Sequence, residues 1–298
     1  MRQIIRQLRS QNLESYPIDQ LNELLSHFGE IPIMVTEYHA GKIIHRARPV
    51  NDEEIVNDKS GLKYKPQRLN TAYLRASTPS NTMFYGSTIA EDDETNSISN
   101  PRITSALEVV PFLRNPNLDG RQRLLYGKWR LDTTINLATI LFTNYRNAKN
   151  QWIKSLSEAY YNDLREFSID IRKKAKRISN FLSSEFSKCV SENENYKYLI
   201  SALITQRFLN RGFDGVLYPS VRSMKLGLNV AIKPEVVDRH LQLISVLDCI
   251  VYKRNDKVII NNIAFCEVPE GCQIFEFTEI NDPSLRFTEE EIQNRLEQ

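Results

Sequence analysis

Apolar and polar positions follow two different spacings along the chain. In residues 1–28, apolar side chains recur at helical spacing in two short runs separated by Ser15-Tyr16-Pro17, so two short helices are predicted there. Strand-like runs follow at residues 31–35 and 42–48, and the segment TMFYGS at 82–87 is expected to form a compact aromatic strand. The first part of the chain is therefore predicted to pass from helices into strands.

The middle of the chain has the longest helical pattern. From Trp152 to Val190, apolar residues recur mainly every three or four positions, which predicts one long amphipathic helix or two with a short break. Pro101 is expected to open a shorter helix before it, because proline is favoured near a first helical position. A further helix is expected at about residues 196–210. The remaining strand predictions lie at residues 128–141, 215–219, 228–232, 243–252, 257–262 and 273–277.

The order of these elements decides the expected fold class. Helices, strands, helices and strands follow one another without the regular alternation of a doubly wound parallel sheet, so the class is α+β. With 298 residues, of which 41% are hydrophobic, the chain is long enough for one large domain or two modest ones. We expect one core of catalytic size with a helical insertion and additions at both ends.

Charge and composition exclude several classes of protein. Lys and Arg number 39 and Asp and Glu 37, and a net charge of +2 argues against general binding to nucleic acid or to an anionic membrane. The basic run at residues 172–177 is flanked by acidic residues and is interpreted as a solvated helix face. No apolar run approaches the roughly 20 residues of a membrane span, and the first residues lack the apolar region of a signal peptide. A soluble, cytoplasmic protein is therefore expected.

Cysteine, histidine and glycine patterns point away from metals and from common nucleotide-binding loops. The four cysteines form no C-x-x-C pair and the four histidines no H-E-x-x-H motif, so neither a disulfide framework nor a zinc site is expected. The sequence also lacks the glycine-rich motifs of phosphate-binding loops and the G-x-S-x-G elbow. No metal is expected as a cofactor.

Two short segments place charged side chains where they could carry chemistry. In KIIHRARP at residues 42–49, Arg46 and Arg48 alternate along a predicted strand and would share a face, where guanidinium groups can bind phosphate or carboxylate. A solvated strand face is the alternative. In SALEVV at residues 105–110, Glu108 interrupts an apolar stretch, so its carboxylate should pair with an arginine or lie at a pocket wall, unless it is an exposed helix residue.

A third segment combines arginine with hydroxyl groups at a turn. RLNTAYLRASTPS at residues 68–80 contains Tyr73 and Arg75, and it runs into the predicted strand that holds Tyr85. A tight turn of this kind can present backbone N–H groups to an anion. An ordinary polar hairpin is the alternative.

A fourth segment ends an apolar strand with polar side chains. In GFDGVLYPSVR at residues 212–222, Ser220 and Arg222 follow the apolar run, and a strand end can expose functional side chains. The alternative is that Ser220 is a solvent-facing strand terminator. No base is adjacent to Ser220 in the sequence, so nothing indicates a hydrolase nucleophile.

Taken in order, HRARP, RASTPSNTMFYGS, SALEV and GVLYPSVR resemble the motifs of the RES domain, a family named for an arginine, a glutamate and a serine. The resemblance covers roughly residues 40–235 apart from the long helical segment, and it implies an ADP-ribosyltransferase-like split β-sheet core. RES domains are the toxin halves of bacterial toxin–antitoxin pairs; they consume NAD by hydrolysis or phosphorolysis, or transfer its ADP-ribose to a protein. By this resemblance Arg46 is the family arginine, with Arg48 as a substitute, Glu108 the family glutamate and Ser220 the family serine.

The resemblance also implies how NAD, as the substrate, would be bound. Arg46 and Arg75 would clamp its pyrophosphate, because guanidinium groups match phosphate oxygens in pairs. Tyr73 or Tyr85 would stack on the nicotinamide ring. The NAD-binding residues implied are Arg48, Tyr73, Arg75, Tyr85 and Arg222.

Catalysis would fall to Glu108 and Ser220 together with the family arginine. Breaking the N-glycosidic bond builds positive charge on the ribose, which the Glu108 carboxylate would stabilise. Ser220 would hydrogen-bond the nicotinamide or ribose part of the ligand. Glu91 competes for the role of Glu108, although its acidic, polar surroundings fit a solvated loop better.

Several departures from a compact toxin accompany the resemblance. The expected division is an N-terminal helical extension at 1–39, a RES-like catalytic domain at 40–235 with a helical insertion at about 150–210, and C-terminal strands and a tail at 236–298 that complete the same core. The expected partners are NAD, a helix-turn-helix antitoxin or regulatory protein, and a second copy in a homo-oligomer, without membrane or direct nucleic-acid binding. A protein-modifying ADP-ribosyltransferase and a non-catalytic nucleotide-binding module are the alternative functions.

Overall fold

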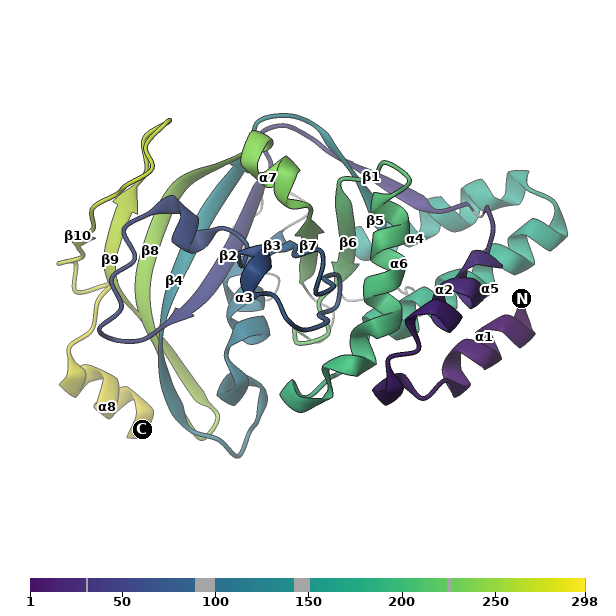
Figure 1. Cartoon of the computed structure of the whole chain (residues 1–298). Helices are drawn as coiled ribbons and strands as arrows, with labels where there is room; N and C mark the ends of the chain where they lie inside the picture. The colour runs from purple at the N-terminus through teal and green to yellow at the C-terminus, as the bar shows by residue number, and fades with distance from the viewer. Residues whose placement is uncertain (31, 89–99, 142–150, 224–226, 298) are drawn as a thin grey trace. The chain divides into compact units, whose positions relative to one another are not determined.

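The computed structural model describes residues 1–30, 32–88, 100–141, 151–223 and 227–297, and these form an α+β fold with both parallel and antiparallel strand pairs (Figure 1). The chain divides into two compact units that interleave along the sequence. Unit 1 comprises Met1–His39, Tyr64–Tyr85 and Thr134–Val237, and unit 2 comprises Ala40–Lys63, Gly86–Thr133 and Asp238–Gln298.

Unit 1 contains a small mixed sheet and most of the helices. Its strands are β1 (Met34–Tyr38), β5 (Ile135–Thr139), β6 (Gly215–Pro219) and β7 (Leu228–Ile232), adjacent in that order. β5 runs parallel to β6, and the other two pairs are antiparallel. Its helices are α1 (Arg2–Ser10), α2 (Ile18–Ser26), α4 (Gln151–Asp163), α5 (Ile169–Phe186) and α6 (Leu199–Leu209), while α7 (Pro234–His240) crosses into unit 2.

The core of unit 1 forms where α2, α5 and α6 meet the strands. Leu21, Phe181 and Leu199 of these helices are buried in one cluster with Val216 of β6 and Ala231 of β7. Removal of this apolar surface from water is the main favourable contribution to the stability of such a core. The core also includes apolar residues of the 64–85 segment, which therefore belongs to this unit.

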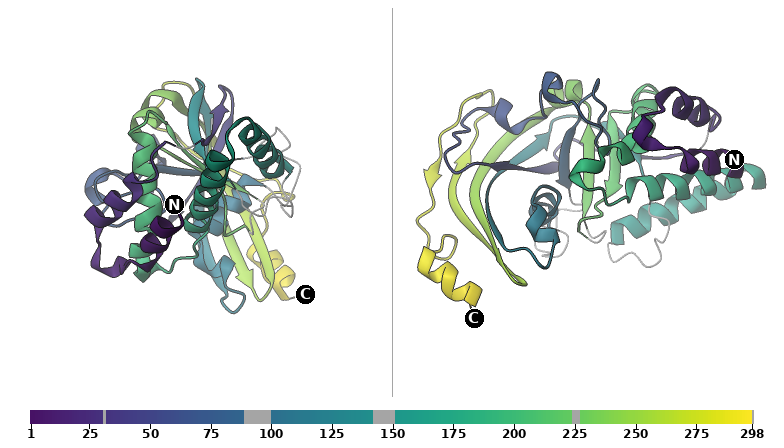
Figure 2. Two further views of the ribbon diagram at one scale, coloured as in Figure 1. Left: turned by 90° about the vertical axis from the view of Figure 1, so that its right-hand side faces the viewer. Right: turned by 60° about the horizontal axis from the view of Figure 1, so that its bottom comes forward.

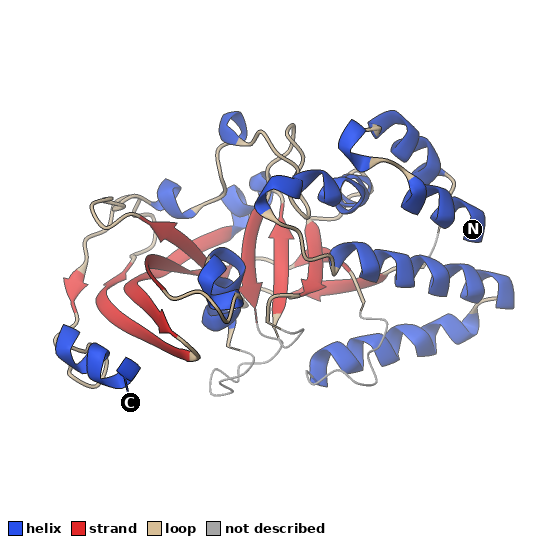
Figure 3. Cartoon of the chain, turned by 90° about the horizontal axis from the view of Figure 1, so that it is seen from below, coloured by secondary structure: helices blue, strands red, loops and turns tan. Residues whose placement is uncertain are grey.

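The long helical pattern in the middle of the chain is two helices. α4 and α5 lie side by side in opposite directions, joined by a short 3-10 turn at Leu164–Glu166 (Figure 3). The Tyr160 hydroxyl lies 3.1 Å from the Ser179 hydroxyl of α5 and donates to the Pro32 carbonyl at 2.9 Å. At the start of α5 the Ser168 side chain accepts a hydrogen bond from the backbone N–H of Ile171, which favours a new helix start at this point.

Unit 2 is built on long antiparallel strands. β3 (Phe84–Thr88) enters it from unit 1, and the order of the strands is β3, β2 (Ile43–Val50), β4 (Gly120–Leu131), β8 (Leu241–Arg254), β9 (Lys257–Glu267) and β10 (Thr278–Glu279). The right view of Figure 2 shows the long, curved β8 and β9, and α8 (Glu289–Glu297) packs against β9. α3 (Pro101–Val109) packs against β2.

Most predicted elements are confirmed, several of them residue for residue. The two N-terminal helices, the helix opened by Pro101 and the strands β6 and β7 lie where the patterns predicted them. Of the two alternatives for residues 152–190, the pair of helices is the correct one. In α3, Pro101 occupies the first turn and the Asn100 side chain caps the helix by accepting from the N–H of Arg102.

Two strand predictions are wrong or incomplete, and two helices were missed. The segment 128–141 is two strands, because the chain turns after Leu131 and passes from unit 2 to unit 1 between Thr133 and Thr134. The predicted strand at 273–277 makes an isolated bridge between Ile274 and Asp58, and the short strand β10 follows it. The helices α7 and α8 were not predicted. An alternating pattern is local, so it does not reveal where one strand ends and the chain passes to a strand of another unit.

None of the helices in the described part of the chain combines the length and apolar character needed to cross a bilayer. All four cysteines are described, and all four are free thiols, with Cys249 and Cys266 buried and Cys189 and Cys272 exposed.

Candidate functional site

The RASTPS turn of unit 1 is held closed by its own backbone. The N–H of Leu74 donates to the Ser77 carbonyl at 3.0 Å, and Thr78 and Asn81 exchange two backbone hydrogen bonds of 3.0 Å each. The Asn70 side chain donates to the Thr78 carbonyl at 2.6 Å. The segment is thus a well-defined hairpin that leads into β3.

Tyr85 ties this turn together through its hydroxyl group. The oxygen accepts a hydrogen bond from the N–H of Ala76 at 3.0 Å and lies 2.8 Å from the hydroxyl of Ser77. Ser77 in turn accepts from the N–H of Met83 at 3.0 Å. Desolvation raises the pKa of Tyr85 to about 12, against the smaller opposing effect of these hydrogen bonds. Tyr85 therefore stays neutral at physiological pH and positions the turn, and the residue is half-buried against the core of unit 1.

Arg75 is the buried centre of this region. Only 7% of the residue is exposed. Its guanidinium donates to the carbonyl of Phe186 and, at 3.1 Å, to that of Lys188. It also lies over two aromatic rings, 5.0 Å from the centroid of Tyr198 and 5.9 Å from that of Tyr218 on β6. Arg75 thus joins the RASTPS turn to the GVLYPSVR strand. The sequence analysis assigned these two segments a shared function but did not predict this contact.

The end of β6 is shaped by two serines. Ser220 is fully buried, and its hydroxyl accepts a hydrogen bond from the N–H of Ser223 at 3.2 Å. The Ser223 hydroxyl accepts from the N–H of Gly227 at 3.0 Å. Arg222 donates to the carbonyl of Val190 at 3.1 Å. Ser220 therefore organises the connection from β6 to β7, and the alternative of a solvent-facing serine is wrong because its exposure is 0%.

Arg75 and Arg222 share one target, the segment that follows α5. Together they bind the carbonyls of Phe186, Lys188 and Val190, so we name residues 186–190 the carbonyl segment. Tyr73 lies nearby in the sequence, is 8% exposed and has its ring 5.9 Å from that of Tyr16. Unit 1 therefore contains Tyr73, Arg75, Tyr85, Ser220 and Arg222; Arg75 and Arg222 share the carbonyl segment, the Tyr85 hydroxyl binds the residue after Arg75, and Ser220 follows the strand whose Tyr218 ring contacts Arg75.

Arg46 and Arg48 lie in unit 2, on the same side of β2. In the register with β4, Arg46 is opposite Gly127 and Arg48 opposite Leu125. Arg48 pairs with the carboxylate of Glu54 at 2.5 Å and donates to the Gly61 carbonyl at 2.9 Å. The predicted shared face is thus present, and Arg48 uses it to hold the loop after β2. Arg46 is half-buried.

Glu108 lies on α3, which covers the opposite face of β2. Ala47 of β2 is buried in a cluster with Ala106 and Val110, at and just beyond the end of α3. Because side chains alternate along a strand, Arg46 and Arg48 point away from the face that carries Ala47. Glu108 is half-buried, and its backbone carbonyl accepts a hydrogen bond from Arg114 at 3.0 Å. Glu91, its competitor, lies outside the described residues.

Comparison with known proteins adds no family to this picture: no protein-family model matches the chain, and no curated protein matches it.

Sequence reasoning missed the residues that support the predicted ones. Ser77, Ser223 and Glu54 bind the backbone or side chains near the residues that were singled out. Neither their residue types nor their spacing distinguishes them from the other polar residues of the sequence. Side-chain partners far apart in sequence become visible only in the folded chain. Among the described residues, no group of three or more His, Cys, Asp or Glu side chains is placed to hold a metal ion.

Proposed function

We propose that this protein is an NAD-consuming enzyme of the RES type, which breaks the bond between nicotinamide and ribose. The observation that carries the proposal is the junction at Arg75, where the RASTPS turn and the strand of GVLYPSVR meet although about 140 residues separate them. Two segments singled out for a shared function thus support one another in unit 1. The proposed core is ADP-ribosyltransferase-like, which accords with the α+β class.

The arginines of unit 1 supply donors for the phosphates of NAD. A guanidinium has five N–H donors in a fixed plane. Arg75 and Arg222 use some of these donors for hydrogen bonds to the carbonyl segment. Phosphate oxygens are stronger acceptors than carbonyl oxygens because they carry charge. Binding of NAD would exchange carbonyls for phosphates, and Tyr73 or the half-buried Tyr85 would stack on the nicotinamide ring.

Arg46 and Glu108 of unit 2 are assigned to phosphate binding and to charge stabilisation. In the proposed reaction the N-glycosidic bond breaks and nicotinamide leaves as a neutral molecule with the bonding electron pair. Water or phosphate then bonds to the ribose carbon, giving ADP-ribose and a proton, or the phosphorylated sugar. The Glu108 carboxylate stabilises the positive charge that develops on the ribose. Ser220 acts as a positioning residue, since its hydroxyl accepts from the backbone of Ser223.

The first experiment is incubation of the purified full-length protein with NAD, with and without inorganic phosphate, and chromatography of the products. Wild-type protein is expected to release nicotinamide, and a phosphate requirement would separate phosphorolysis from hydrolysis. Glu108→Gln should lower turnover by roughly 100-fold or more, because it removes a charge that acts in the transition state. Glu270→Gln, at an exposed carboxylate of unit 2, is the matched control and should keep full activity.

Two results would overturn the proposal. Full turnover in Glu108→Gln, Arg46→Ala and Ser220→Ala would show that the residues are wrongly assigned. No nicotinamide from the wild type would exclude NAD cleavage by this chain on its own. Radiolabelled NAD that leaves label on a protein would instead identify an ADP-ribosyltransferase.

A non-catalytic nucleotide-binding module that keeps the same fold is the second candidate. NAD binding measured by calorimetry without nicotinamide release would support this candidate. For the enzyme, we propose a bacterial toxin or defence effector as the setting, with a helix-turn-helix antitoxin or regulatory protein as partner.

A further inference from the structure

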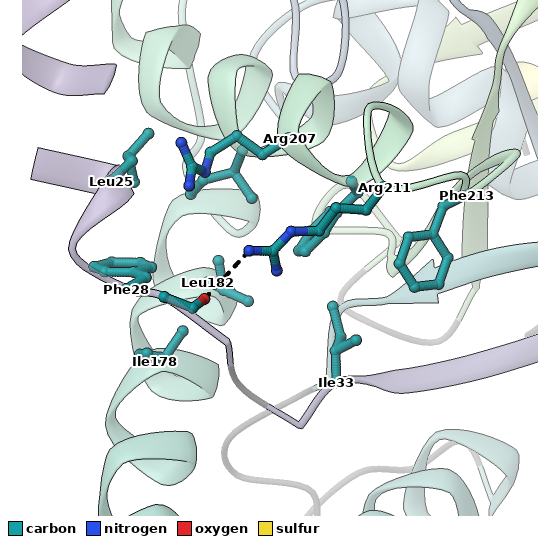
Figure 4. A pocket seen from close by; sticks show the side chains of 11 residues that line it. Leu25, Phe28, Ile33, Ile178, Leu182, Arg207, Arg211 and Phe213 are labelled. Atoms are coloured by element: carbon teal, nitrogen blue, oxygen red, sulfur yellow. Dashed lines mark hydrogen bonds between the residues drawn. The ribbon is translucent and has the colours of Figure 1, made fainter. Parts of the chain in front are cut away.

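An apolar pocket lies within unit 1 (Figure 4). Neither Arg75 nor Arg222, which bind the carbonyl segment, is among the residues that line it. It is lined by residues of α2, α5 and α6 and by the residues that follow α2 and α6. The cavity has a volume of about 40 Å³. Leu25, Phe28, Leu182 and Phe213 are among the apolar side chains of its walls. All the lining residues are apolar apart from Gly29, Arg207 and Arg211.

Two arginines, Arg207 and Arg211, contribute to the wall of the pocket. Arg207 and Arg211 are four residues apart at the end of α6, so both point to one side of that helix. In Figure 4 the guanidinium group of Arg207 extends towards Leu25 of α2, while that of Arg211 donates to the Gly29 carbonyl after this helix at 3.3 Å. Among the described residues, no carboxylate forms an ion pair with either arginine.

The electrostatic surroundings are those of an anion site. Burial and the neighbouring charge of Arg211 both lower the pKa of Arg207. Lys174 of α5 brings a third positive charge to the chain after α2. Its ammonium group donates to the carbonyl of Glu30, the residue after Gly29, at 3.5 Å. Gly29 has a φ of +57°, a left-handed conformation that turns its carbonyl towards these cations and that a residue with a Cβ adopts less readily.

We propose that this pocket binds a short-chain carboxylic acid, with its carboxylate between Arg207 and Arg211 and its apolar tail in the cavity. A carboxylate offers two oxygens to a guanidinium and relieves the repulsion between the two charges. About 40 Å³ of cavity corresponds to roughly three water-sized groups, so about three carbons of a short tail lie within it and a long fatty chain does not fit. Inorganic phosphate would satisfy the arginines but would leave the apolar walls empty.

The test is calorimetric titration of the full-length protein with three probes: sodium hexanoate, sodium acetate and 1-hexanol. Acetate has the charged head without a tail, and 1-hexanol has the tail without a charge. Hexanoate is expected to bind at least roughly ten-fold more tightly than either, because each half of the ligand contributes separately. Hexanoate binding should also weaken with added NaCl, while 1-hexanol binding should not.

Two substitutions locate the site. Arg207→Met and Arg211→Met should each weaken hexanoate by roughly five- to ten-fold and leave 1-hexanol unchanged, because methionine keeps the apolar stem and loses the charge. Arg165→Met, at an exposed position after α4, is the matched control and should bind hexanoate as the wild type does. Circular dichroism and 1-hexanol binding check that each variant is folded.

The proposal fails if acetate binds the wild type as tightly as hexanoate does, which would indicate a plain anion site. It also fails if hexanoate does not bind, or if both arginine variants bind it unchanged. None of these measurements depends on NAD turnover, so they stand apart from the proposed reaction.

Discussion

Two pairs of arginines in unit 1 differ in the sequence segments that carry them and in their hydrogen-bond partners. Arg75 and Arg222 come from segments that the sequence marked for function, and both are engaged by backbone carbonyls of one short segment. Arg207 and Arg211 come from a helix end that carried no recognisable motif, and Arg211 has a single carbonyl while neither has a carboxylate partner among the described residues. The comparison teaches that a motif does not tell how far an arginine is engaged within the fold: Arg75 is buried and donates to two carbonyls, whereas Arg222 and Arg211 each donate to one.

The largest expected effect distinguishes Arg75 as a structural residue. Arg75→Met leaves the carbonyls of Phe186 and Lys188 buried without their donor, so the free energy of unfolding should fall by about 3 kcal/mol. Urea denaturation followed by tryptophan fluorescence measures it. Arg75→Lys should recover only part of the loss, because an ammonium group cannot span two carbonyls as a guanidinium does. A change under about 1 kcal/mol in Arg75→Met would place this residue with Arg207 and Arg211.

Arg222 provides the intermediate case. It is half-buried and donates to one carbonyl, that of Val190, so Arg222→Met should lower the free energy of unfolding by about 1 kcal/mol. The same denaturation series gives the value. If the loss equals that of Arg75→Met, the carbonyl segment depends on both arginines as a unit, and the double variant should then be clearly non-additive.

Arg207 should show the smallest effect, and its sign is informative. Arg207→Met removes a partly desolvated charge that Arg211 repels, so the free energy of unfolding should stay within about 0.5 kcal/mol of the wild type or rise slightly. Thermal unfolding at low and high salt measures it, and any gain in stability should shrink as salt screens the repulsion. A loss above about 1 kcal/mol would mean that Arg207 is a structural residue like Arg75.

The fold was predictable where the signal was local. Helical and strand periodicity located α1, α2, α3, β6 and β7, because the side of an element that faces the core repeats with the period of the element itself. The same reasoning failed at residues 128–141, where one alternating stretch belongs to two strands in different units. Nothing in that alternation records the end of one strand and the passage to the other unit.

For the candidate site, the choice of segments was predictable and the roles of the residues were not. The sequence singled out Tyr85 and Ser220, and both lie in the region that Arg75 connects. It proposed Tyr73 or Tyr85 for ring stacking and did not foresee that the Tyr85 hydroxyl forms hydrogen bonds with Ala76 and Ser77 within the turn. It also treated Arg46 and Glu108 as parts of one site, although α3, which carries Glu108, covers the face of β2 opposite to Arg46.

The sequence by itself determined the α+β class, the positions of most helices and strands and the segments in which arginine, tyrosine and serine gather. These follow from periodicity and from the chemistry of individual side chains, which are properties of neighbours along the chain. Only the tertiary structure decided that Arg75 and Arg222 hold the carbonyl segment and that Arg207 and Arg211 face an apolar pocket. Those outcomes depend on which distant backbone groups need donors once they are buried, and burial is settled when the chain has folded.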